Sequence, residues 1–241
     1  MTPILQLKEI RKSYGDRTIL ESLAFEIEEG EIVGLLGPNG AGKTTAFYMT
    51  IGLIRPDFGK IIFKGVDITN MAMHERSKMG MGYLAQEPSI FRGLTVEENI
   101  KCILETLDLS SKEQQNRLDK LLEELHLSHL RKSKAVFLSG GERRRLEITR
   151  CLVTNPKLLL LDEPFANVDP ITVSDMKQMI KILKRKGISV LITDHNAKEI
   201  FSIVDRSYLV MDKKVIASGC VEDLIKNPDV KNRYLGPDFS L

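Results

Sequence analysis

The chain has 241 residues, of which 42% are hydrophobic and 28% are charged, and its net charge is +2. This composition is typical of a soluble globular protein, and the near balance of charge gives no support for nucleic-acid binding. The three cysteines, Cys102, Cys151 and Cys220, are odd in number and widely spaced. This argues against a disulfide framework or a zinc site and fits a reducing cytoplasm. No apolar run approaches the ~18 residues that cross a bilayer, so we expect membrane contact only through partners.

The first part of the chain predicts two strands of an antiparallel sheet. Apolar and polar residues alternate over residues 4–10 and again over residues 23–27, as in strands with one buried face. Residues 11–16 are expected to form a turn, which contains Tyr14. An exposed aromatic ring at this place can stack on a flat base, although an ordinary turn tyrosine is the alternative on the residues alone.

A phosphate-binding loop follows between a buried strand expected at residues 31–36 and a helix expected at residues 45–51. The loop has the pattern Gly, four residues, Gly-Lys and Ser/Thr. It consists of Gly37, Pro38, Asn39, Gly40, Ala41, Gly42, Lys43, Thr44 and Thr45. Glycines let several backbone N–H groups turn toward one anion. The lysine adds a positive charge for the β- and γ-phosphates, and the Thr44 hydroxyl can bind Mg²⁺.

Two short strands and a possible docking loop come next. We expect strands at residues 61–65 and 81–86, the second ending in Gln86, and a short helix at residues 73–79 between them. Phe91 and Arg92 lie at the tip of the loop that follows. An apolar side chain beside a cation suits a contact with a partner protein. A loop phenylalanine that folds inward is an equally good interpretation, since single exposed apolar residues are common.

Residues 91–155 predict a helical insert between two strand-rich parts. Thr95 with Glu98, and Ser110 with Glu113, form the capping-box pairs that begin helices. The second helix has a core-facing stripe at helical spacing, formed by Leu118, Leu121, Leu122 and Leu125.

A second anion site is predicted where the next helix begins. The turn consists of Ser139, Gly140, Gly141 and Glu142. The N-terminus of a helix presents unpaired N–H groups to an anion. Beside a phosphate loop, this turn predicts a second contact with the same kind of nucleotide, although a simple helix cap is the alternative. We expect most of the arginines at residues 143–145 to lie on a solvated helical face.

Acidic residues end a run of four leucines at residues 158–161. Such a run predicts a central strand of a parallel sheet, and ligands bind at the carboxyl ends of these strands. Successive residues point to opposite sides, so Asp162 and Glu163 are expected to differ in role. Asp162 can hold Mg²⁺ and Glu163 can face the attacking water. A second buried strand at residues 189–193 ends just before His195, and this position would aim the imidazole at the γ-phosphate.

These motifs together resemble the ATP-binding subunits of ABC transporters over the whole chain. In order, they are the loop at 37–45, Gln86, the segment 138–142, the acidic pair at 162–163 and His195. Tyr14 matches the base-stacking aromatic residue of the family. The resemblance implies a single α/β domain over 1–241 with a P-loop NTPase fold. A RecA-like mixed-sheet core at about 1–90 and 156–241, with an antiparallel β-subdomain, would be joined by a helical subdomain at 91–155.

The resemblance also implies an activity and an assembly. ATP and Mg²⁺ would be bound by a head-to-tail homodimer, each ATP lying between the phosphate loop of one copy and residues 139–142 of the other. Glu163 would polarise water, His195 would steady the γ-phosphate, and Gln86 would join Mg²⁺ to the docking loop. Two integral membrane permease subunits would bind near Phe91 and Arg92. The pair would be cytoplasmic and peripheral on the inner membrane.

Within the family, the chain is similar to the ATPases of the lipopolysaccharide export systems of Gram-negative bacteria. The similar segments are residues 34–49, 86–92, 139–145, 165–170 and 234–241. Asn167 departs from that group, which usually has a small residue there. An ATPase of another ABC transporter, such as one for branched-chain amino-acid uptake, is the alternative. A soluble, non-transport member is less expected, because such proteins usually carry two cassettes or long coiled-coil inserts.

Overall fold

The computed structural model describes residues 3–166, 168–237 and 239. Its strands form one mixed sheet in the order β5-β4-β1-β2-β10-β9-β3-β8-β7-β6. Their bounds are β1 Leu5–Tyr14, β2 Arg17–Ile27, β3 Ile32–Leu36, β4 Phe58–Phe63, β5 Val66–Asp67, β6 Met81–Leu84, β7 Leu158–Asp162, β8 Ser189–Thr193, β9 Arg206–Met211 and β10 Lys214–Gly219. This mixed sheet with helices on it confirms the predicted α/β class.

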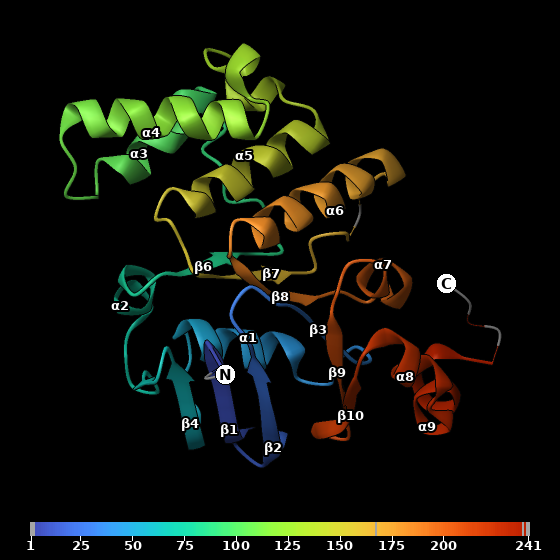
Figure 1. Ribbon diagram of the computed structural model, residues 1–241. Helices are drawn as coiled ribbons and strands as arrows, with labels where there is room; N and C mark the ends of the chain where they lie inside the picture. Colours follow the sequence, from blue (N-terminus) through green and yellow to red (C-terminus); the bar gives the residue numbers. More distant parts are fainter. Residues whose placement is uncertain (1–2, 167, 238, 240–241) are drawn as a thin grey trace.

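Parallel strands form the half of the sheet that contains β6, β7, β8, β3 and β9. Strand β7 is buried on both faces, as the four leucines predict. Leu158 and Leu160 pack in the core that contains α1 (Lys43–Ile51). Leu159 and Leu161 pack in the core that contains α5 (Gly140–Leu152) and α6 (Pro170–Arg185). In Figure 1, α1 lies below these strands and α5 and α6 lie above them.

Antiparallel strands form the other half of the sheet, and the turn predicted at residues 11–16 is wrong. Strand β1 continues to Tyr14, and two residues, Gly15 and Asp16, separate it from β2. The reason is tertiary, because β1 is registered with β4 as far as Arg11 and with β2 as far as Tyr14, and the β2 ladder extends the strand through polar residues. One registered residue pair, Lys214 with Ser22, joins this half to β10.

Helices α3 (Val96–Leu104), α4 (Ser111–Glu124) and α5 lie together at the top of Figure 1, with the short turns η1 (Ser128–Leu130) and η2 (Ala135–Phe137). Both predicted capping boxes are confirmed. Thr95 N–H donates to Glu98 at 2.7 Å, and Ser110 N–H donates to Glu113 at 2.8 Å. The predicted stripe is also confirmed, because its four leucines are at most 6% exposed: Leu118, Leu121, Leu122 and Leu125.

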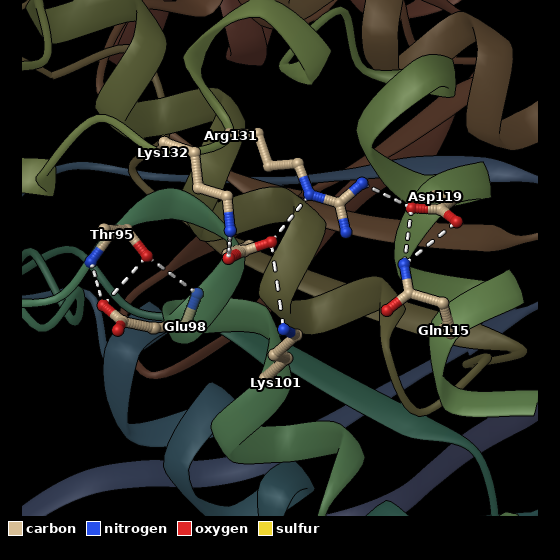
Figure 2. A network of polar contacts seen from close by, with 8 residues as sticks. Thr95, Glu98, Lys101, Gln115, Asp119, Arg131 and Lys132 are labelled. Atoms are coloured by element: carbon tan, nitrogen blue, oxygen red, sulfur yellow. Dashed lines mark hydrogen bonds and ion pairs between the residues drawn. The ribbon is translucent and has the colours of Figure 1, made fainter. Parts of the chain in front are cut away.

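A polar network ties α3 to α4 and to the segment before η2 (Figure 2). At its centre the Glu97 side chain, 8% exposed, accepts from Lys132 Nζ and from Arg131 Nε at 2.6 Å. Lys101 Nζ lies 3.8 Å from the same carboxylate, and Arg131 also reaches Asp119 at 2.6 Å. Hydrogen bonds from Lys132 and Arg131 hold the pKa of Glu97 below its usual value. The network therefore joins α3 and α4 to the segment that contains Arg131 and Lys132.

The remaining helices are short and flank the sheet. They are α2 (Met73–Lys78), α7 (Ala197–Phe201), α8 (Val221–Lys226), α9 (Pro228–Val230) and the π-helix η3 (Lys231–Leu235). The helix expected at residues 73–79 is confirmed as α2, whereas α7 was not predicted. Among the helices of the described residues, none combines the length and the apolar character needed to span a membrane.

Candidate functional site

The loop between β3 and α1 is folded around the side chain of Lys43. This side chain is buried, and its Nζ donates to the carbonyl oxygens of Gly37 at 2.7 Å and Pro38 at 3.0 Å. Burial lowers the pKa of Lys43, and the nearby carboxylates, Glu163 first among them, offset this lowering only in part. Gly37 has φ 153°, and a Cβ there would lie 2.2 Å from the Val210 carbonyl oxygen. The loop therefore holds a cation at its centre and has no room for a side chain at its start.

One hollow of about 590 Å³ opens beside this loop. It is lined by Arg17, Ile19, Asn39, Gly40, Gly42, Lys43, Thr44, Thr45, Gln86, Glu163 and His195. Nine of these eleven were predicted from the motifs, so the structure brings together residues that are up to 156 positions apart. In the described part of the chain the predicted residues Tyr14, Gly37, Pro38, Ala41 and Asp162 lie outside this lining. Sequence reasoning missed Arg17 and Ile19, although their place in the hairpin just after Tyr14 was a usable signal.

Asp162 ends β7 with its side chain buried and fixed. Thr193 Oγ1 donates to Asp162 Oδ1 at 2.7 Å, and the Tyr83 hydroxyl lies 3.5 Å from Oδ2. Asp162 is 1% exposed, and burial raises its pKa. Burial and the neighbouring carboxylate also raise the pKa of Tyr83. A carboxylate held in this way is a preformed oxygen ligand that has given up most of its contact with water.

Glu163 stands on a strained backbone. Its φ of 45° lies in the left-handed region, which costs a residue with a Cβ about 1–3 kcal/mol. The side chain accepts a hydrogen bond from Gln86 Nε2 at 2.7 Å, so the loop after β6 meets the residue after β7. Strain of this kind persists only where the surrounding structure imposes it. Here the Glu163 N–H donates to the Thr193 carbonyl at 3.0 Å and holds the turn.

His195 follows β8, and its side chain is 57% exposed in the wall of the hollow. Its Nδ1 lies 3.5 Å from Oδ1 of Asp194, which is fully buried. Asp194 in turn accepts from the N–H groups of Phe165 and Asn196, both at 3.0 Å. The imidazole is thus exposed to solvent and lies beside a buried carboxylate that also accepts from the Phe165 and Asn196 N–H groups.

The turn at Ser139 forms the N-terminus of α5. Ser139 N–H donates to Glu142 at 2.7 Å, and Ser139 Oγ accepts from the Glu142 N–H at 3.3 Å. Within the described residues this turn does not line the hollow beside the phosphate loop. Gly140 lines a neighbouring hollow of about 350 Å³, whose wall also includes Gln86 and Glu163. The two turns that the sequence predicts to bind anions therefore line different hollows, which share the side chains of Gln86 and Glu163.

Known proteins resemble the chain in sequence and in fold. Residues 20–166 match the family described as "ABC transporter". The chain belongs to the ABC transporter family. It is 49% identical over 241 residues to the lipopolysaccharide export system ATP-binding protein LptB of Acidithiobacillus ferridurans, with 100% of both chains covered.

Two solved structures of the family share the fold. MJ1267, an ATP-binding cassette of an ABC transporter in its ADP conformation, has a TM-score of 0.87 at 30% identity, with 95% of this chain and 97% of that chain covered. The dimeric post-hydrolysis state of the ATP-binding cassette MJ0796, bound to ADP and Pi, has a TM-score of 0.78 at 26% identity, with 90% and 98% covered. The chain is thus an ABC ATPase with a P-loop NTPase fold, as the motifs predicted.

The predicted docking loop of this ABC ATPase has Phe91 at its surface. The ring is 52% exposed, so the inward-folded alternative is wrong. The Arg150 guanidinium lies over it, 4.9 Å from the ring centroid, and Arg150 also donates to the Ser89 carbonyl. The Phe91 backbone is held by buried Asn99, which accepts from its N–H at 2.8 Å. Arg92 is exposed beside it.

The expectation of a solvated arginine face is wrong for Arg144. This side chain is 9% exposed and pairs with Glu147 at 2.7 Å. Its guanidinium also lies 3.4 Å from the Ala85 carbonyl, next to Gln86. Helix α5 therefore contacts the segment after β6 through Arg144 and Arg150. The sequence departure at Asn167 falls outside the residues that the structure describes.

Proposed function

We propose that this ABC ATPase powers lipopolysaccharide export from the inner membrane toward the outer membrane. The observation that supports this cargo is the 49% identity with an LptB over the full length of both chains. The chain would be cytoplasmic and would bind the inner membrane through partners. The small net charge of +2 gives no reason to include a nucleic acid among those partners.

Residues in and beside the hollow have roles in holding ATP. The loop from Gly37 to Thr45 surrounds the β- and γ-phosphates, and Lys43 supplies positive charge at its centre. The Tyr14 ring, 53% exposed at the end of β1, stacks on the base. The site therefore binds a nucleoside triphosphate through backbone N–H groups, one buried cation and one aromatic face.

The donor set fits Mg²⁺. Thr44, Gln86 and Asp162 offer a hydroxyl, an amide and a carboxylate oxygen, which are the hard ligands that Mg²⁺ prefers. Among the described residues no cluster of three His, Cys, Asp or Glu side chains could hold a metal ion alone. This agrees with a metal held jointly by a few protein oxygens and by substrate phosphates. When bound, Mg²⁺ neutralises negative charge on the β- and γ-phosphate oxygens.

Hydrolysis uses Glu163 and His195. Glu163 polarises a water molecule and accepts its proton while the water oxygen forms a bond to the γ-phosphorus. The bond from this phosphorus to the β–γ bridging oxygen breaks, and ADP leaves with that oxygen. His195 steadies the γ-phosphate oxygens. Gln86 donates to Glu163 at 2.7 Å and so keeps the carboxylate in place.

Two copies complete the site. Among the described residues, the phosphate-loop hollow is not lined by Ser139, Gly140, Gly141 or Glu142 of the same chain, and this supports a head-to-tail dimer. In this dimer each ATP contacts the phosphate loop of one copy and this turn of the other. Because ATP contacts both copies, it favours the closed pair. Residues 1–90 and 156–241 act as the nucleotide-binding core, and residues 91–155 move as the helical subdomain.

Two integral membrane permease subunits bind on the outer side of the helical subdomain. Phe91 offers an exposed ring and Arg92 an exposed cation, and such pairs are enriched at protein interfaces. Arg144 and Arg150 connect α5 to this loop. Movement of α5 on dimer closure is therefore passed to the permeases through the segment from Gln86 to Arg92.

The test of the catalytic role is Glu163→Gln, which keeps the size of the side chain and removes its charge. Turnover should fall by about 10²–10⁴-fold, the usual contribution of a general base. ATP binding should remain, and closed dimer should accumulate on size exclusion with ATP. Glu113→Gln is the matched control, because Glu113 is an exposed cap of α4 far from the hollow. Normal turnover in Glu163→Gln would refute the role.

The test of the cargo is the identity of the copurifying membrane proteins. The tagged chain is isolated in mild detergent from its own cells, and the integral membrane proteins bound to it are identified. Two short export-type permeases, with ATPase activity that changes when lipopolysaccharide is added to the complex, would support the proposal. Amino-acid permeases in their place would contradict it while leaving the ATPase chemistry intact.

A further inference from the structure

Asp57 is hydrogen-bonded to the three residues that precede Tyr14, to two through its carboxylate and to one through its backbone N–H. Its Oδ1 accepts from Lys12 Nζ at 2.7 Å, and its Oδ2 accepts from the Ser13 N–H at 2.7 Å. The Asp57 N–H donates to the Arg11 carbonyl at 2.9 Å. Asp57 thus holds one short stretch of β1 through both its side chain and its backbone, although it lies 44 positions after Ser13 in the sequence.

The hydrogen bonds of Asp57 take the place of backbone pairing between β1 and β4, which ends before β1 itself ends. On the β4 side of β1, the registered pairs stop at Arg11 with Phe58. On the β2 side, pairing continues as far as Tyr14 with Arg17. The end of β1 is therefore a strand on one side only, and the Asp57 carboxylate supplies the acceptor that β4 no longer offers to Ser13. A backbone held on one side alone would fray more easily.

Lys12 extends this contact to the aromatic ring. Its side chain is 15% exposed, and its Nζ lies 5.3 Å from the centroid of the Tyr14 ring. A cation at this distance from a ring face is attracted by the ring quadrupole. One face of Tyr14 is therefore covered by Lys12, and the opposite face is the one that a base can occupy.

We propose that Asp57 is a positioning residue that sets the orientation of Tyr14 for stacking on the nucleotide base. This inference rests on the proposed ATP site. Asp57 fixes the backbone before the ring through Ser13 and fixes the cation on one ring face through Lys12. Its hydrogen bonds to Lys12 and Ser13 keep the pKa of Asp57 below its usual value, so both contacts persist at neutral pH.

The proposal predicts a loss that depends on the base. In Asp57→Ala both contacts are lost, and affinity for ATP and ADP should fall about two- to tenfold, the size of one hydrogen bond. Affinity for inorganic tripolyphosphate, which has no base, should not change. Turnover at saturating ATP should be unchanged while KM rises. Asp57→Asn keeps an acceptor for the Ser13 N–H, so its loss should be smaller.

The experiment measures binding of ATP, ADP and tripolyphosphate to the full chain by calorimetry, with turnover assays alongside. Tyr14→Ala gives the full effect of the ring. Asp67→Asn is the matched control, because Asp67 at the end of β5 is also an exposed carboxylate that accepts a backbone N–H, from Thr69 at 3.0 Å, and also lies near a lysine, Lys60. This variant should bind all three ligands as the wild type does.

Three results would overturn the inference. Equal weakening of tripolyphosphate and ATP in both Asp57 variants would mean a general structural role. Unchanged ATP binding in Asp57→Ala, with a base-dependent loss in Tyr14→Ala, would reject the role of Asp57 and leave the proposed ATP site standing. No base-dependent loss in Tyr14→Ala would reject base stacking itself, and the Asp57 proposal with it.

Discussion

Replacing Thr193 by valine removes one buried hydroxyl that is hydrogen-bonded to Asp162, and it should lower the stability of the folded chain. Thr193 Oγ1 donates to Asp162 Oδ1 at 2.7 Å, and these residues are 0% and 1% exposed. Valine keeps the shape of threonine, so packing is preserved. The other partner of the carboxylate is the Tyr83 hydroxyl at the longer distance of 3.5 Å. We expect Thr193→Val to lower the free energy of unfolding by about 1.5–3 kcal/mol, the range for hydrogen bonds to charged groups.

This loss should depend on pH in a defined direction. Burial raises the pKa of Asp162 in the folded chain above its unfolded value, so ionisation is penalised in the folded state. That penalty is present above the folded pKa and is relieved as the pH falls through it. The hydroxyl partly offsets the penalty by stabilising the ionised form. The difference between wild type and Thr193→Val should therefore be larger at pH 8 than at pH 5.

Urea unfolding of both chains at the two pH values measures this difference, with the slope m checked for equality. Thr172→Val is the matched control. Thr172 Oγ1 also donates to an aspartate at 2.7 Å, but Asp169 is exposed and water can replace the hydroxyl. We expect a loss of about 0.5–1 kcal/mol there. Equal losses in the two variants, or a loss at Thr193 that grows on acidification, would refute the reasoning.

Three further predictions concern other parts of the chain. Because the pKa of Glu97 is lowered, its contribution to stability is present above the unfolded value near 4.5 and is lost as the pH falls. Glu97→Gln should therefore be less stable than wild type at pH 7 by about 1–2 kcal/mol. Urea unfolding near pH 4 should show a smaller difference in stability between the two chains, and an unchanged difference would contradict this. Gly37→Ala should lose ATP binding in calorimetry, because the added Cβ would lie 2.2 Å from the Val210 carbonyl oxygen. Wild-type affinity in this variant would contradict the prediction, since it would mean that the loop can shift to admit the methyl group. Burial raises the pKa of Cys151 to about 12, so a thiol reagent at pH 8 should label it only after urea is added, as mass spectrometry of digests can show, and labelling of the folded chain would argue otherwise.

The sequence predicted those features whose cause is local. A capping box needs two residues three positions apart, and a phosphate loop needs glycines where the backbone must turn. Both were placed correctly, as was the alternation of Leu158 to Leu161 between two cores. The contact between Gln86 and Glu163 was not predicted, and it arises because the carboxyl ends of the neighbouring parallel strands β6 and β7 meet at one edge of the sheet.

Features that depend on distant parts of the chain were not predictable. Arg76 is 1% exposed and donates to the carbonyls of Met49 and Thr50, both at 2.7 Å, where α1 ends. A buried guanidinium of this kind depends on which carbonyl oxygens the fold brings near it, and the residues around Arg76 do not encode that. The burial of Arg144 has the same origin. The extension of β1 to Tyr14 came from its pairing with β2, which continues beyond the last pair with β4 at Arg11.

The contacts of Lys43 with its own loop bear on how quickly and tightly an anion can be captured. Its ammonium group already rests on two carbonyl oxygens, those of Gly37 and Pro38. The conformation of the loop is thus set during folding, and a triphosphate binds a preformed loop that it does not have to order. The entropic cost of ordering the loop is therefore met during folding and not during binding. The anion has only to replace two carbonyl oxygens as the partner of the Lys43 ammonium group.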